Sequence, residues 1–167
     1  MSTIQALLLL TFGTYAAATQ VASYSMTANN LVAAATPTTV TYTFTPLALA
    51  ATETFTITHS EARYATDAAT ACTVTGTGTS GTISCANVGA VLTCTLDTGA
   101  VVAAAPNTVV CTTNIAVNGA AGDKTSTMVT TNDADASAAA TTTITAASTT
   151  TDCNVPALGW KLATGDC

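Results

Sequence analysis

Residues 38–58 read TTVTYTFTPLALAATETFTIT, and this stretch decides the fold class. Apolar side chains alternate with threonine from Val40 to Phe44, and the alternation returns at Phe55 and Ile57. Side chains of a strand point alternately to its two faces. The period of two therefore predicts two strands, each with an apolar and a polar face.

Similar short segments follow along the chain, separated by Gly, Pro, Asn and Asp. We expect about eight strands, the pattern of an all-β antiparallel sandwich, in a domain that covers residues 21–147. Apart from a hairpin around residues 76–81, the expected strands are residues 21–32, 38–45, 53–59, 88–96, 107–117, 126–131 and 141–147.

The expected hairpin turns through the glycine-rich sequence GTGTSG at residues 76–81. Glycine is favoured where a tight turn requires positive φ. If Val74 lies opposite Ile83, the same register places Cys72 opposite Cys85. The remaining loops are expected at residues 46–52, 60–69 and 118–124, and the charged segment 60–69 is expected to be solvated.

Six cysteines in a chain of 167 residues indicate an oxidising compartment. The four central cysteines keep phase with apolar neighbours two positions away, which predicts that they face the core. The expected disulfides are Cys72–Cys85, Cys94–Cys111 and Cys153–Cys167, with other pairings among the four central cysteines left open. A metal site is disfavoured because no C-x-x-C spacing occurs and His59 is the only histidine.

The two ends of the chain differ from the middle. Residues 1–20 contain the apolar run LLLL followed by small residues, which resembles a secretory signal peptide, although no basic residue precedes the run. A retained N-terminal extension is the alternative. Residues 148–167 contain the only tryptophan and two cysteines, and we expect a disulfide-closed tail. No other stretch is long and apolar enough to span a membrane.

The charge of the chain excludes nucleic acid as a partner. Only 7% of the residues are charged and the formal net charge is −6. Three scattered cations, Arg63, Lys124 and Lys161, cannot form the basic face that nucleic acid requires. The surface must be polar through hydroxyl groups, which gains little solubility from charge repulsion and favours packing into an assembly.

Candidate chemical groups are sparse. Asp123, Asp133 and Asp135 are weak calcium candidates, because Ca²⁺ prefers oxygen ligands, but acidic residues in turns usually bond the local backbone. His59 is expected at the surface, with no cysteine or carboxylate placed to form a catalytic group with it. The expectation is therefore a protein that is not an enzyme and carries no cofactor.

Threonines dominate the polar faces, and those of residues 39–45 and 54–58 are expected to form one ladder on one sheet face. The clusters Thr141, Thr142, Thr143 and Thr149, Thr150, Thr151 are candidates for O-glycosylation. A flat threonine array also suggests ice binding, but the cysteine spacings are irregular where antifreeze repeats are regular.

The run VTYTFTPLALAATETFTIT, the cysteine-rich middle and VVAAAPNTVVCTTNIAVNGAAGDK together resemble threonine-rich extracellular domains of microbial surface proteins. The resemblance covers residues 22–147. It implies an immunoglobulin-like sandwich with a structural role at the cell surface. This chain has one copy where such domains often form tandem arrays.

Taken together, these features favour a secreted structural protein that assembles with itself into an extracellular filament or surface layer. If residues 21–32 are not needed in their own sheet, they could be donated to a neighbouring subunit. The alternative is a monomeric extracellular adhesion module that binds a glycan, a surface or ice.

Overall fold

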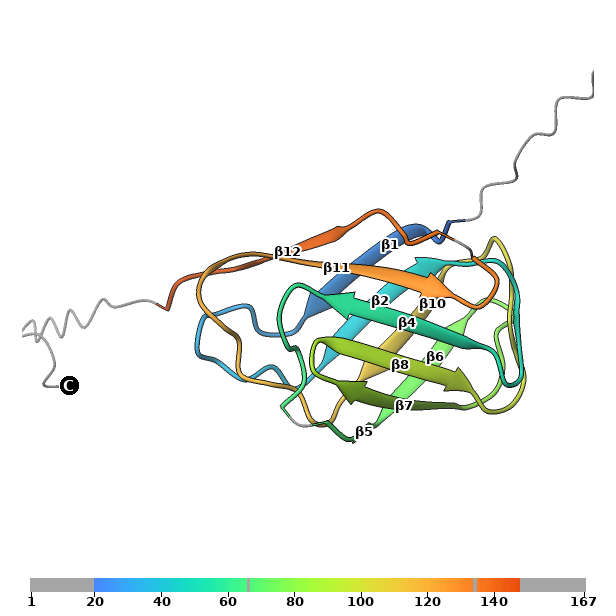
Figure 1. Ribbon diagram of the computed structural model, residues 1–167, viewed down its shortest axis with the longest axis horizontal. Coiled ribbons are helices and arrows are strands. Elements are labelled where there is room, and N and C mark those ends of the chain that lie inside the picture. The colour runs from blue at the N-terminus through green and yellow to red at the C-terminus, as the bar shows by residue number, and fades with distance from the viewer. Residues whose placement is uncertain (1–19, 66, 134, 148–167) are drawn as a thin grey trace, which may run out of the picture.

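The computed structural model describes residues 20–65, 67–133 and 135–147, and every structural statement below concerns these residues. Their strands form two packed antiparallel sheets, as Figure 1 shows. The predicted all-β sandwich is confirmed. The predicted signal peptide, the tail and its cysteines Cys153 and Cys167 lie outside the described residues.

One layer is a four-stranded sheet in the order β1-β2-β10-β6. Its strands are β1 (Ala22–Ala28), β2 (Val40–Thr45), β10 (Asn107–Cys111) and β6 (Cys72–Gly76).

The other layer is a six-stranded sheet in the order β12-β11-β4-β8-β7-β5. Its strands are β12 (Ala140–Ile144), β11 (Gly122–Thr130), β4 (Thr54–His59), β8 (Val91–Leu96), β7 (Ile83–Val88) and β5 (Ala69–Thr70). A small third ladder joins β3 (Leu49–Ala50) to β9 (Ala100–Val101).

The strand order is immunoglobulin-like. β1, β2, β10 and β6 occupy the places of strands A, B, E and D, and β12, β11 and β4 occupy those of G, F and C. β8 and β7 extend the sheet beyond β4, on the side where variable domains carry additional strands. Within the described residues, nine strands have five residues or more, close to the predicted number, and three have two.

The core lies where the sequence pattern places it. Val40, Tyr42 and Phe44 of β2 and Phe55 and Ile57 of β4 are all buried. The rings of Phe44 and Phe55 meet across the two layers with centroids 5.5 Å apart. The apolar faces of the two strands therefore close one core, as predicted.

The predicted single threonine ladder is wrong. β2 belongs to the four-stranded sheet and β4 to the six-stranded sheet, so their threonines cover opposite outer faces of the molecule. The loop between them, which contains Pro46, crosses from one layer to the other. Alternation identifies which side chains face outward but carries no information about which sheet a strand joins.

The first strand has a partner within its own chain. β1 pairs with β2 over most of its length, with Met26 opposite Tyr42 and Ala28 opposite Val40. The Asn29 side-chain oxygen accepts hydrogen bonds from the backbone N–H groups of Thr38 and Thr39, which fixes the turn between the strands. Donation of this segment to a neighbour, considered from the sequence, would unpair β2.

The expected hairpin between Val74 and Ile83 is also wrong, because the chain changes sheets at Ala71. Before Ala71, β5 pairs with β7 and places Thr70 opposite Cys85. After Ala71, β6 pairs with β10 in the other layer. The residues from Cys72 to Val74, expected to pair with β7, therefore pair with β10 instead.

Two element boundaries differ from expectation. β10 ends at Cys111, and Val117, expected on the core face, is 55% exposed. β11 begins at Gly122, inside the segment expected to be a turn, because pairing with β12 extends it to Gly122 opposite Ile144.

Candidate functional site

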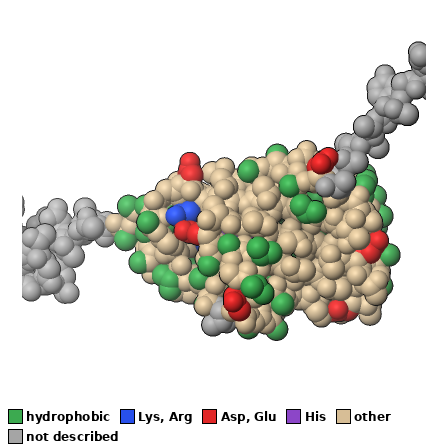
Figure 2. Space-filling model, viewed as in Figure 1, with side chains coloured by type: hydrophobic (Ala, Val, Ile, Leu, Met, Phe, Trp, Pro, Cys, Tyr) green, Lys and Arg blue, Asp and Glu red, His purple; other side chains and the backbone are tan. Residues whose placement is uncertain are grey.

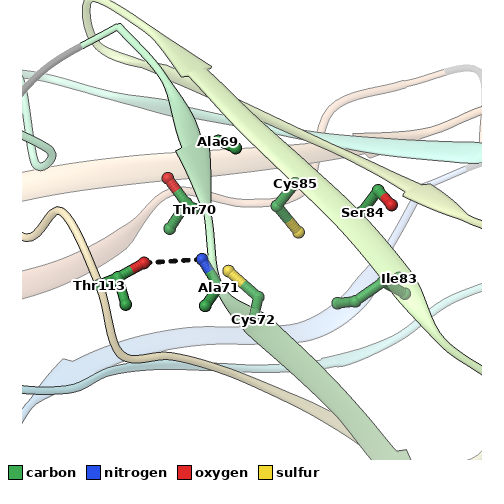
Figure 3. A pocket seen from close by; sticks show the side chains of 8 residues that line it. All are labelled: Ala69, Thr70, Ala71, Cys72, Ile83, Ser84, Cys85 and Thr113. Carbon is green, nitrogen blue, oxygen red and sulfur yellow. Dashed lines mark hydrogen bonds between the residues drawn. The ribbon is translucent and has the colours of Figure 1, made fainter.

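A groove opens at the edge of the sandwich where β6 and β7 diverge. The chain crosses between the sheets at Ala71, whose backbone N–H donates to Thr113 Oγ1 at 2.8 Å (Figure 3). Beyond this crossing no strand among the described residues covers the gap between β6 and β7. We call this feature the edge groove.

Two adjoining hollows of about 400 and 300 Å³ make up the edge groove. They share Cys72 and Ile83, and Figure 3 shows the first hollow with both side chains directed toward it. The residues that line the two hollows are Ala69, Thr70, Ala71, Cys72, Ile83, Ser84, Cys85 and Thr113 for the first, and Cys72, Thr73, Val74, Gly81, Thr82 and Ile83 for the second. None of these side chains carries a charge.

Two disulfides lie beside the groove, and their pairing corrects the expected one. Cys72 bonds Cys111 and Cys85 bonds Cys94. Each disulfide joins directly opposite residues of neighbouring strands in the same sheet. The expected pairs would have joined the two sheets. They fail because β6 and β7, treated as one hairpin, lie in different layers.

The sulfur atoms of Cys72, Cys85 and Cys94 lie within 4.8 Å of one another, which brings the two disulfides into contact across the core. Cysteine binds a metal ion as a thiolate. All four of these cysteines form disulfides, each within one sheet, so the cluster offers no thiolate ligand.

A buried hydrogen-bonded group occupies the other part of the core, and it includes His59, which was expected at the surface. His59 is only 6% exposed. Its Nδ1 lies 3.0 Å from the Ala90 carbonyl oxygen, and its Nε2 lies 2.9 Å from Tyr42 Oη. Tyr64 Oη is 2.8 Å from the same Tyr42 oxygen.

These contacts define the protonation of the group. A carbonyl oxygen only accepts, so His59 Nδ1 carries the proton and Nε2 accepts from the Tyr42 hydroxyl. Tyr64 then donates to Tyr42. Burial lowers the pKa of His59 to about 4 and raises that of Tyr64 to about 12. Both ring nitrogens serve structural hydrogen bonds, which leaves neither for acid–base work.

Arg63 is buried as well, although its segment was expected to be solvated. Its Nη1 donates to Asn118 Oδ1 at 2.8 Å, and Asn118 in turn donates to the carbonyls of Asn30 and Val32. The guanidinium thus fastens the loop after β4 to the loops at the end of β1. Neighbouring Glu61 forms an ion pair with Lys124 at 2.9 Å.

The three calcium candidates do not converge on one place. Asp123 lies in the second position of β11 and accepts from Thr143 Oγ1 at 2.6 Å. Asp133 lies beside Thr130 at the far end of the same strand, about 23 Å from Asp123 at about 3.3 Å per residue. Its Oδ2 accepts from the Thr130 hydroxyl and from the Leu47 N–H. Asp135 forms a bridge with Gln20. Asp123 and Asp133 each accept hydrogen bonds local to turns and strand ends.

Among the candidate glycosylation sites, the described threonines separate into two kinds. Thr141 and Thr143 are exposed on β12. Thr142 is 6% exposed and its hydroxyl donates to the Met26 carbonyl at 2.8 Å, so in the folded chain this hydroxyl is not accessible to an enzyme. Thr149, Thr150 and Thr151 lie outside the described residues.

The outer face of the four-stranded sheet carries a regular hydroxyl array, which we call the hydroxyl grid. Strand register aligns its side chains in two rows across all four strands. The rows are Ser25, Thr43, Thr108 and Thr75, and Thr27, Thr41, Val110 and Thr73. Val110 interrupts the second row with an apolar side chain. Figure 2 shows the opposite face, on which scattered charged and hydrophobic side chains lie among other side chains and backbone.

Sequence reasoning located the four central cysteines at the core but missed the edge groove. A groove depends on which strand ends a sheet, and that is a property of pairing. No feature of the local sequence marks the change of sheet at Ala71, which lies between Thr70 and Cys72.

Comparison with protein-family models finds no match to this chain, and comparisons with curated proteins and with solved structures likewise find none. Within the described residues no helix is long and apolar enough to cross a membrane.

Proposed function

We propose that this chain is a secreted structural protein that assembles with copies of itself into an extracellular filament or surface layer. The observation that carries the proposal is the edge groove, an uncharged opening beside a sheet edge that no other strand covers in the part of the chain that the structure describes. Exposed sheet edges readily accept a strand from another chain unless charges or proline block them.

Secretion is supported by the disulfides. Both bonds within the described residues are structural crosslinks, which persist in oxidising compartments. The apolar N-terminal run fits the same route. Mass spectrometry of the secreted protein would identify its first residue and any O-linked sugar on Thr141 or Thr143.

Electron microscopy and sedimentation of the purified protein test the assembly directly. We expect ordered filaments or sheets to form above a threshold concentration, under oxidising conditions and without added ligand. Dispersed monomers at every concentration up to the solubility limit would contradict the proposal.

A second candidate function, adhesion to a surface, glycan or ice, is favoured by the hydroxyl grid. Its two rows cross all four strands with the strand spacing of about 4.8 Å between neighbours. Thr43→Lys would place a charge in the middle of this grid, and Thr56→Lys would do so on the opposite face. If the grid binds, thermal hysteresis or glycan-array binding falls with Thr43→Lys and persists with Thr56→Lys.

A further inference from the structure

The open edge of β6 presents backbone hydrogen-bonding groups to the groove. Cys72 and Cys111 lie opposite each other with Cα atoms 4.0 Å apart, the close spacing of a non-hydrogen-bonded antiparallel pair. In such a pair the N–H and C=O groups point away from the partner strand. Those of Cys72, and of Val74 two residues later, therefore face away from β10 toward the open edge.

The floor of the groove is apolar and incompletely covered. Cys72, Val74 and Ile83 pack against the core but remain only partly buried. An added strand suits such an edge. Its backbone pairs with the free N–H and C=O groups, and its alternate side chains fill the hollow beside the half-covered apolar residues.

The chain itself contains a segment with this pattern. Residues 157–163 read ALGWKLA, in which Leu158, Trp160 and Leu162 occupy every second position. In an extended conformation these three side chains point to one face, about 7 Å apart. Gly159 and Lys161 would point to the other. The two hollows on either side of Cys72 and Ile83 suit large apolar side chains at such a spacing.

The tail of the same molecule can barely reach the groove. The described chain ends beyond β12, and β12 and β5 are at opposite edges of the six-stranded sheet. The path across five strand spacings and the depth of the sandwich is about 34 Å. Ten residues, 148–157, extend at most about 35 Å. A tail from a second copy meets no such restriction.

We propose that residues 157–163 of one copy pair with the open edge of β6 in a second copy and bury Leu158, Trp160 and Leu162 in its edge groove. This inference rests on the proposed self-assembly and specifies its contact. Because tail and groove are different surfaces, the contact is head-to-tail and propagates into a filament.

Trp160 is the only tryptophan and reports on the contact directly. We expect the fluorescence emission of the full chain to move to shorter wavelength as concentration rises, in parallel with assembly measured by sedimentation. A short-wavelength emission at every concentration would mean that the tail occupies its own groove, which overturns the second-copy contact. Long-wavelength emission from assembled protein would overturn the inference while leaving the proposed function intact. If neither assembly nor a shift in emission is observed, both this inference and the proposed function are overturned.

Two pairs of variants separate this contact from effects on folding. Leu158→Ser with Leu162→Ser should abolish the shift and the assembly, whereas Gly159→Ser with Lys161→Ser, on the other side of the alternation, should preserve both. In the groove, Ala71→Arg should abolish them and Ala86→Arg should not, since both alanines are exposed but only Ala71 lines the hollow. If the two variants of either comparison changed assembly and emission equally, the proposal would be overturned.

A mixing experiment identifies donor and acceptor. The Ala71→Arg chain keeps Trp160 but has a blocked groove, and the Trp160→Phe chain keeps an open groove but has no tryptophan. Neither chain alone should show a concentration-dependent shift in tryptophan emission. Adding the Trp160→Phe chain should shift the Trp160 emission of the Ala71→Arg chain, and failure to do so would overturn transfer between copies.

Discussion

His59 is a buried base held neutral by its neighbours. The unfolded chain takes up a proton at this residue below about pH 6.5, but the folded chain does so only near pH 4, because burial lowers the pKa of the imidazole to about 4. More protons are bound to the unfolded state in this interval. The free energy of unfolding should therefore fall by about 3 kcal/mol from His59 alone as pH drops from 7 to 4.

Chemical denaturation at several pH values measures this effect. His59→Gln is the control, because a glutamine can accept from Tyr42 and donate toward Ala90 without titrating. The wild-type advantage in free energy of unfolding over His59→Gln should shrink or reverse toward pH 4. Carboxylates contribute equally to both proteins, so they cancel in this difference. Parallel pH profiles would show that His59 is not the group responsible.

Gly81 illustrates a backbone constraint at a single residue. Its φ of +108° lies in a region that other residues avoid, and a Cβ atom there would collide with the Thr98 carbonyl. Gly89 also has positive φ, +57°, but open space surrounds it. We expect Gly81→Ala to destabilise the fold by about 3 kcal/mol or more, and Gly89→Ala by about 1 kcal/mol.

Urea unfolding of the two glycine variants provides the comparison. Both substitutions add the same methyl group to a loop, so the difference reports the close approach to the Thr98 carbonyl together with the less favourable φ at Gly81. Equal destabilisation would mean that the loop at Gly81 relaxes away from Thr98.

At the scale of strands, the two disulfides close loops of different length. Cys72 and Cys111 are separated by 39 residues in sequence, and Cys85 and Cys94 by 9. A longer loop loses more conformational entropy when it is crosslinked in the unfolded chain. Replacing both cysteines by alanine should therefore cost about 4 kcal/mol for the first pair and about 3 kcal/mol for the second.

Denaturant titration of the two double variants tests this order. Each variant leaves two small side chains in the core, so their packing losses partly cancel in the comparison. If loss of Cys85–Cys94 were the more destabilising, native-state packing of the buried β7–β8 pair would outweigh the entropy of the unfolded chain.

For individual strands, the sequence predicted the features that depend on residues close together in the chain. The alternation in β2, β4 and β8 predicted their core faces, because it records burial directly. Pairing depends on distant residues. β5 and β6 form one continuous extended run that serves two sheets, and nothing local distinguishes Thr70, which meets Cys85, from Cys72, which meets Cys111.

The candidate site followed the same division. The core-facing cysteines were predicted from their phase with apolar neighbours, whereas the edge groove arises from the sheet switch at Ala71. His59 and Arg63 were placed at the surface because charged and titratable residues are rarely buried. Their burial depends on partners such as Tyr42 and Asn118, which are remote in sequence.

For the whole molecule, charge sets the conditions under which copies associate. The formal net charge is −6, and only three cations oppose nine carboxylates. Copies therefore repel one another at neutral pH, while the edge groove and the outer faces contribute apolar and hydrogen-bonded attraction that salt does not screen. Raising ionic strength from about 0.01 M to about 0.15 M shortens the screening length from about 30 Å to about 8 Å.

Assembly should consequently strengthen with salt, and the threshold concentration measured by sedimentation should fall as sodium chloride is added. A charge variant provides the control. Asp97→Asn and Asp67→Asn remove two exposed carboxylates, one just after β8 and the other just before β5. The double variant should therefore assemble at lower salt and respond less to further salt. Assembly that weakened with salt would instead require ion pairs between copies, with Lys124 or Lys161 as the available cations. A contact made by uncharged strands should strengthen with salt, because salt screens the repulsion between copies and leaves the contact itself unchanged.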